Sequence, residues 1–79
     1  MNYTIVFHTQ SGAIKFDNKM RKLKIPCFLQ PVPRKLSSSC GICAKLIYGE
    51  NPISLMEPEI ERIYKNCSGS QYELLYESQ

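Results

Sequence analysis

The chain has 79 residues, of which 43% are hydrophobic and 22% are charged, and its formal net charge is +3. This length allows a single domain over residues 1–79, and the composition excludes a disordered tail. No apolar run approaches the ~20 residues of a membrane-spanning helix, and the start, MNYTIVFHTQ, lacks the basic and long apolar regions of a signal peptide, so we expect a cytoplasmic protein with no membrane partner.

The first half of the chain is predicted to form a strand, a helix and a second strand. Residues 3–8 alternate and are rich in β-branched and aromatic types, which is typical of a strand. The helix should begin after Thr9 or Ser11, which suit the N-cap, and end at residues 25–26, before the second strand over residues 27–32. One apolar stripe recurs at three- and four-residue steps along this helix: Ala13, Phe16, Met20 and Leu23.

The second half is predicted to contain two further strands with a helix between them. Residues 43–48 and 71–76 are rich in strand-forming types. Residues 54–57 have the Ser-x-x-Glu spacing of a capping box, so we expect a second helix that starts there. This helix should point Ile60 inward and end near Asn66.

The predicted order is β-α-β-β-α-β, which indicates an α+β fold of the ferredoxin-like type, a two-layer sandwich with a four-stranded antiparallel sheet. In that topology the C-terminal ends of the first two strands meet the N-terminal ends of the last two at one edge. We therefore expect His8, the 31–43 loop and Cys67 to lie together at that edge, and Cys27 to lie at the other. A domain this small has little stability to spare, so a homodimer would help to stabilise it.

The most unusual stretch of the chain is QPVPRKLSSSCGIC, residues 30–43. A cysteine acts as a nucleophile only as a thiolate, and nearby cations favour that anion. Arg34 shortly precedes Cys40, Ser39 closes a run of three serines that could bind an anion, and Gly41 leaves the sulfur open to a partner. We therefore predict that this loop is a thiol site.

Cys43 completes a Cys-x-x-Cys pair with Cys40, and the residues alone leave its role open. In thioredoxin-like proteins such a pair opens a helix, whereas here it precedes a predicted strand. Zinc is an alternative, because Cys40, Cys43, Cys67 and His8 would offer three sulfurs and one nitrogen at the same edge. His8 is a candidate base there, although a structural histidine at a strand end is the plainer interpretation.

A binding module whose cysteines are incidental is the other alternative. Through residue 45 the chain has eight Lys/Arg and one acidic residue, whereas the remainder has two Lys/Arg and six Glu. The basic half could therefore meet an acidic partner or RNA. No RNP-like sequence accompanies the aromatic residues of the predicted strands, which argues against a nucleic-acid partner.

The stretch VFHT, followed by a helix and then by IPCFLQPVPRKLSSSCG, resembles the small selenium/sulfur-carrier-like proteins. The shared features are a strand ending in Phe-His, a helix ending in Ile-Pro, and a Pro-x-Pro-Arg loop that closes on Ser-x-x-Cys-Gly. The resemblance implies that Cys40 is the carrier cysteine. It also implies that five residues shape the loop: Pro31, Pro33, Arg34, Ser39 and Gly41.

The chemistry that the resemblance implies is transfer of a sulfane sulfur or selenium atom. Cys40 would accept the atom from a donor protein such as a cysteine desulfurase and pass it to an acceptor protein. Such a protein is a carrier without a cofactor rather than a turnover enzyme. Position 43 departs from the family, which usually has an apolar residue there, so Cys43 could act as a release thiol that expels the bound atom by forming a disulfide.

Overall fold

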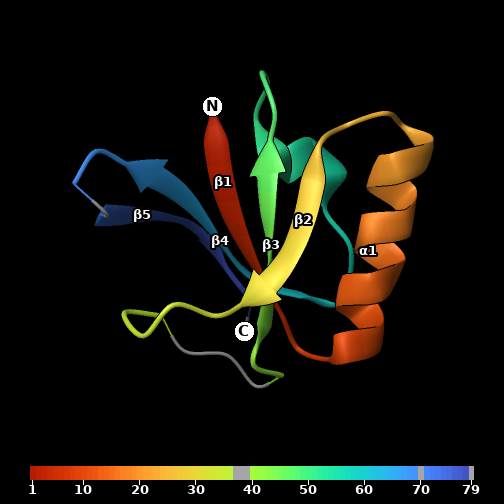
Figure 1. Ribbon diagram of the computed structural model, residues 1–79, viewed down its shortest axis with the longest axis horizontal. Helices are drawn as coiled ribbons and strands as arrows, with labels where there is room; N and C mark the ends of the chain where they lie inside the picture. Colours follow the sequence, from red (N-terminus) through yellow and green to blue (C-terminus); the bar gives the residue numbers. More distant parts are fainter. Residues whose placement is uncertain (37–39, 70, 79) are drawn as a thin grey trace.

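The computed structural model describes residues 1–36, 40–69 and 71–78. Across these residues the chain forms one α-helix, one short 3-10 helix and a single five-stranded sheet (Figure 1). In chain order the elements are β1 (Asn2–Phe7), α1 (Gln10–Lys22), β2 (Cys27–Pro31), β3 (Ile42–Ile47), η1 (Pro52–Leu55), β4 (Ile60–Cys67) and β5 (Gln71–Glu77).

The sheet has the strand order β2-β3-β1-β4-β5, and every neighbouring pair is antiparallel. The prediction of a ferredoxin-like β-α-β-β-α-β sandwich with four strands is therefore wrong, because the observed order is β-α-β-β-β-β. The error lies in the predicted second helix. Residues 60–67, most of which were assigned to it, form β4, the longest strand that the structure describes.

A β-bulge explains why β4 resembles a helix in sequence. Ile60 and Ile63 are three residues apart, which matches one face of a helix but places residues of a regular strand on opposite faces. The register between β1 and β4 shifts between Val6 and Phe7, so that Glu61 is an extra residue in β4. Both isoleucines are consequently buried in the same core.

Pro58 explains why the capping-box spacing does not start an α-helix. The chain forms only the four-residue η1, capped by the Asn51 side chain, which accepts a hydrogen bond from the Ile53 N–H at 3.0 Å. The residue before a proline is pushed out of the helical region, so Glu57 cannot continue the turn into a helix. The chain instead extends into β4.

The first half of the chain follows the prediction. β1 and β2 are parallel to each other, and β3 lies between them in the opposite direction. The Thr9 side chain caps α1 by accepting a hydrogen bond from the Gly12 N–H at 3.0 Å. With 13 residues and a polar outer face, α1 is too short and too polar to cross a membrane, and it is the one α-helix in the part of the chain that the structure describes.

The core lies between α1 and one face of the sheet. Phe7 of β1 packs against Phe16 of α1 with their ring centroids 5.4 Å apart. The other large buried residues of this core come from α1, from the central strands and from η1: Tyr3, Ile5, Met20, Leu46, Leu55, Ile60 and Ile63. Burial of these apolar side chains is the main term that holds the helix on the sheet.

Side chains on the opposite face of the sheet, the one directed away from α1, are also buried. Thr4, Val6 and Cys43 point to this face because they alternate with core residues along β1 and β3, and none of them is more than 1% exposed. After β2 the chain runs toward β4 and β5 (Figure 1). Lys35 and Leu36 of this segment line a pocket together with side chains of β4 and β5, so the segment contributes to covering the opposite face.

The end of α1 generates a prediction about stability. Lys24 has a φ of 59°, and the Lys24 N–H donates to the Arg21 carbonyl while the Ile25 N–H donates to the Met20 carbonyl. This is a Schellman turn with lysine where glycine is preferred. Because a left-handed conformation costs a non-glycine residue roughly 1–2 kcal/mol, we expect Lys24→Gly to raise the free energy of unfolding by about 0.5–1 kcal/mol in urea denaturation.

The matched control for this prediction is Lys22→Gly, which places glycine inside α1 two residues earlier. Since glycine in a helix is less favourable than other residues by up to about 1 kcal/mol, this variant should lower the free energy of unfolding. A Lys24→Gly protein no more stable than the unmodified chain would contradict the prediction.

Candidate functional site

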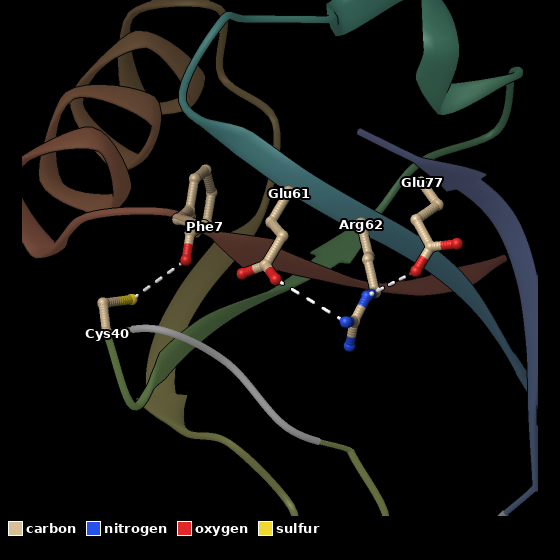
Figure 2. A network of polar contacts seen from close by, with 5 residues as sticks. All are labelled: Phe7, Cys40, Glu61, Arg62 and Glu77. Atoms are coloured by element: carbon tan, nitrogen blue, oxygen red, sulfur yellow. Dashed lines mark hydrogen bonds and ion pairs between the residues drawn. The ribbon is translucent and has the colours of Figure 1, made fainter. Parts of the chain in front are cut away.

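Cys40 lies where the chain enters β3, beside the C-terminal end of β1. Its thiol is 3.3 Å from the carbonyl oxygen of Phe7 (Figure 2) and 3.3 Å from that of Ile42, so it can donate a hydrogen bond to either. The Gln10 side-chain amide, in the first turn of α1, donates to the Cys40 carbonyl at 3.4 Å. The sulfur is therefore positioned by β1, β3 and the start of α1, which converge at this end of the sheet.

These contacts describe a resting thiol. A thiol has one proton and can donate a hydrogen bond to only one of the two carbonyls at a time. A carbonyl has no hydrogen to donate, so neither of them stabilises a thiolate. Cys40 is half-buried and packs against the hydrophobic core. Nucleophilic attack by Cys40 therefore requires the sulfur to turn away from the carbonyl of Phe7 or Ile42 and toward solvent or a partner.

Gly41 is needed next to this cysteine for its backbone conformation rather than for space. Its φ is 75°, and a Cβ atom added there would meet no atom within 4 Å. The Gly41 carbonyl accepts a hydrogen bond from the Val32 N–H at 3.1 Å, which joins the two ends of the loop. Gly41 therefore turns the chain from the loop into β3 and fixes the place at which Cys40 emerges.

The cations predicted to activate Cys40 lie in a turn of the same loop. The Leu36 N–H donates to the Pro33 carbonyl at 3.0 Å, which closes a β-turn with Arg34 and Lys35 at its centre. Arg34 is exposed there, and the hydrogen bonds described for the Cys40 thiol run to backbone carbonyls, not to Arg34. The predicted site residue Ser39 lies outside the described residues.

Cys43 points to the face of the sheet opposite α1, whereas Cys40 packs against the core. Cys43 is fully buried opposite Val6 in β1 and Gln30 in β2, with its sulfur 3.8 Å from the Pro31 carbonyl. Burial raises the pKa of the Cys43 thiol, against a smaller lowering effect of the hydrogen bond with Gln30. The charge of Cys40 also raises the pKa of Cys43, so the two thiols interact electrostatically although only Cys40 is partly exposed.

Cys67 does not join Cys40. Cys67 is the last residue of β4. Because β4 begins at the end of the sheet where β1 ends, Cys67 lies at the opposite end of the sheet. The expectation that Cys67 belongs to the cluster, and the zinc set that depended on it, are therefore wrong. In residues 1–36, 40–69 and 71–78 no three His, Cys, Asp or Glu side chains are grouped to bind a metal ion.

His8 follows Phe7 and stays at the Cys40 end of the sheet. Its side chain is exposed, and its backbone N–H donates to the Glu59 carbonyl at 2.8 Å. Cys27 lies at the start of β2, at the other end of the sheet, as expected. The structure therefore brings His8, Cys40 and Gly41 to one end and separates Cys27 and Cys67 from them.

An interaction that was not predicted from the sequence affects the pKa of the Cys27 thiol. Burial raises the pKa of the Cys27 thiol to about 12, and the charge of Asp17 and a hydrogen bond to its carboxylate add to this effect. Arg21 pairs with Asp17 at 3.0 Å and opposes the shift. The separation of ten positions from Asp17 to Cys27 matches no local spacing rule, because the contact exists only once α1 packs on β2.

A second unforeseen network lies at the bulge of β4. The Arg62 guanidinium is 3.1 Å from the Glu77 carboxylate of β5 and 3.6 Å from that of Glu61, and Figure 2 shows these groups in one view with Cys40. The pKa of Arg62 is raised, mainly by a hydrogen bond with Tyr64. The other carboxylate oxygen of Glu61 is buried without a hydrogen-bond partner. The network joins β4 to β5 near the end of the sheet where Cys40 lies.

The family model described as "Putative Se/S carrier protein-like" matches residues 2–65 of the chain. The chain belongs to this family. The matched region runs from β1 into β4 and contains Cys27, Cys40 and Cys43, whereas Cys67 and β5 lie outside it. No curated protein and no solved structure matches the chain.

The different surroundings of the four thiols predict different reactivity. At pH 8 we expect iodoacetamide to modify the partly exposed Cys40 and Cys67 well before Cys43, which is buried, and before Cys27, which is also partly exposed but has a raised pKa. With a pKa of about 12, only roughly one Cys27 in 1,000 is a thiolate at pH 9. Peptide mass spectrometry of the folded protein, with a urea-unfolded sample as control, measures the order, and modification of Cys43 as fast as Cys40 would contradict it.

The raised pKa of Cys27 also predicts a dependence of stability on pH. In the unfolded chain this thiol ionises near its ordinary pKa of 9.0, whereas in the folded protein it ionises near about 12. Its contribution to the free energy of unfolding is therefore complete below pH 9 and is lost as the pH rises from 9 toward 12. Urea denaturation at pH 7 to 11 should show a steeper loss of stability in the unmodified chain than in Cys27→Ala, and parallel curves would contradict this.

Proposed function

We propose that the protein carries a sulfane sulfur or selenium atom on Cys40 between a donor and an acceptor protein. Membership of the Se/S carrier-like family supports a carrier role, and the contrast among the three cysteines of the matched region supports Cys40 as the carrier. Cys43 is buried, and Asp17 and burial keep Cys27 protonated. Cys40 is partly exposed at the end of a loop, where a partner can reach it.

The transfer is an exchange at sulfur. The Cys40 thiolate attacks the terminal sulfur of a persulfide on the donor, the sulfur–sulfur bond of the donor breaks, and the donor thiolate leaves with the electron pair. Cys40 becomes a persulfide, and the proton lost by its thiol passes to solvent or to the departing donor thiolate. Selenium is transferred in the same way, as a selenosulfide. The exchange causes no net oxidation and needs no cofactor.

The contacts of Cys40 suit this exchange. In the resting protein the Cys40 thiol can donate a hydrogen bond to the carbonyl of Phe7 or of Ile42. Once an atom has been added, the terminal S–H or Se–H can donate a hydrogen bond to the same carbonyls. Arg34 and Lys35, in the turn of the same loop, add positive charge to the loop that leads to Cys40.

Cys43 is a structural residue in this proposal rather than a release thiol. An attack by Cys43 on the inner sulfur of a Cys40 persulfide would form the disulfide and expel hydrogen sulfide. The location of Cys43, buried on the face opposite α1, disfavours that attack. The carried atom is then retained until the thiol of an acceptor protein removes it.

The proposed partners are therefore a donor such as a cysteine desulfurase and an acceptor thiol or selenium-using protein, in the cytoplasm. The chain acts as a carrier in this scheme, and turnover belongs to the partners. His8, exposed at the same end of the sheet, is available to take the proton released when a partner docks.

The test is to load the purified protein with a persulfide donor and to find the modified cysteine by non-reducing mass spectrometry. We expect one added sulfur on Cys40, no adduct in Cys40→Ser, and an unchanged yield in the matched variant Cys67→Ser. An adduct on Cys67, or none on any cysteine, would contradict the proposal. Cys43→Ala should hold the adduct as long as the unmodified chain, and a much longer lifetime in this variant would make Cys43 the release thiol.

A further inference from the structure

The edge of the sheet next to Cys40 has features of a docking site for another strand. β2 is the last strand of the sheet on this side, with β3 as its neighbour. The Ile47 N–H donates to the Pro26 carbonyl and the Val32 N–H to the Gly41 carbonyl, so alternate residues from Pro26 to Val32 face β3. The backbone groups of Leu29, midway between them, therefore point away from β3. Figure 1 shows β2 as the outer strand beside β3.

Apolar surface lies beside these outward-facing groups. Leu29 and Phe28 are exposed, and a shallow pocket is lined by Leu29, Gln30, Pro31, Gly41 and Ile42. Gly41 is the neighbour of Cys40, so the pocket borders the thiol site. A strand that pairs with β2 could place one apolar side chain in this pocket, and the main-chain hydrogen bonds would supply the remaining affinity.

The charges around β2 indicate which charge a partner strand should carry. Three cations of α1 have carboxylate partners, since Lys15 pairs with Glu59, Lys19 with Glu57, and Arg21 with Asp17. Lys65 of β4 and four other cations show no ion pair in the described part of the chain. The four surround β2 in sequence or register: Lys22 and Lys24 before it, Arg34 after it, and Lys45 opposite Phe28 in β3.

Acidic residues gather at the other side of the sheet. Glu73 and Glu77 lie on β5, the opposite edge strand, and Glu61 lies on β4. The excess of Lys/Arg in the first half of the sequence therefore becomes a basic edge at β2. A partner complementary to that edge has to be acidic.

From these observations we propose that β2 binds an extended acidic segment of the donor or acceptor protein, which adds to the sheet as a sixth strand. This inference rests on the proposed carrier function, because it names the partner surface for the same thiol. An antiparallel partner strand begins at the end of β2 that leads to Pro31 and Cys40. The partner cysteine should therefore lie just before the N-terminal end of its acidic strand.

The test uses a variant that cannot carry sulfur, so that it stays independent of the carrier chemistry. Isotope-labelled Cys40→Ser protein is titrated with the peptide Cys-Gly-Glu-Val-Glu-Val-Glu, and amide chemical shifts are followed by NMR. We expect the largest shifts at Phe28, Leu29 and Gly41. The charge-reversed peptide, with Lys in place of Glu, should bind at least roughly tenfold more weakly.

Two controls separate strand pairing from general attraction between charges. An acidic peptide N-methylated on the groups that face β2 should lose binding, because it can no longer donate main-chain hydrogen bonds. The double variant Lys22→Glu/Lys24→Glu should reverse the charge preference, while its unfolding curve checks that it folds.

Other results would overturn the proposal. These are shifts that map to β5, equal binding of all peptides, no binding, or self-association of the unliganded protein through β2. The loading of unmodified protein with sulfur is measured separately, so a protein that is loaded on Cys40 but does not bind the peptide keeps its carrier role and loses this docking surface.

Discussion

The structure depends on a central strand that is buried on both faces. β1 pairs with β3 on one side and with β4 on the other, and Tyr3 to Phe7 are all buried. A strand of this kind needs a cover on each face, because its polar backbone is satisfied by its neighbours and its side chains gain stability only when they leave water. α1 covers one face, and the segment after β2 contributes to the cover of the other.

This constraint also positions the sulfur. The segment that crosses the opposite face must return to β3, which pairs with β1, so the last residues before β3 reach the end of β1. Cys40 occupies that place, and its thiol lies against the Phe7 carbonyl of the central strand. Cys40, the partly exposed residue on which the proposed chemistry depends, thus lies against β1, the most buried strand of the fold.

The predictions from sequence succeeded where short-range rules apply. The Thr9 cap, the buried residues Ala13, Phe16 and Met20 of the predicted stripe, and the parallel arrangement of β1 and β2 depend on local preferences and on known rules of chain connection. Leu23, the fourth predicted member of the stripe, follows the end of α1 and is exposed. The second helix failed because the bulge at Glu61 gives a strand the three-residue spacing of a helix. The misplaced Cys67 and the zinc alternative followed from that one error.

The features of the candidate site also differ in whether local sequence rules could predict them. Composition and turn chemistry pointed to Cys40 and Gly41, whose part in a thiol site stays a prediction. The burial of Cys43 and the contact of Cys27 with Asp17 depend on strand register and on the packing of α1, which local patterns do not determine. The result is a chain with four cysteines in which Cys43 is buried and the pKa of Cys27 is raised by burial and by Asp17, while Cys40, which is partly exposed, lies at the end of the central strand.

The most direct test of this account is the state of Cys40 in the cell. The protein would be expressed in cells supplied with sulfur or selenium, purified without reductant and with exposed thiols blocked at lysis, and analysed as intact protein and as peptides by mass spectrometry. The account predicts a fraction of molecules with one extra sulfur or selenium atom, located on Cys40 and removed by dithiothreitol. Unmodified Cys40 in every molecule, with the extra atom absent or located on Cys67, would contradict it.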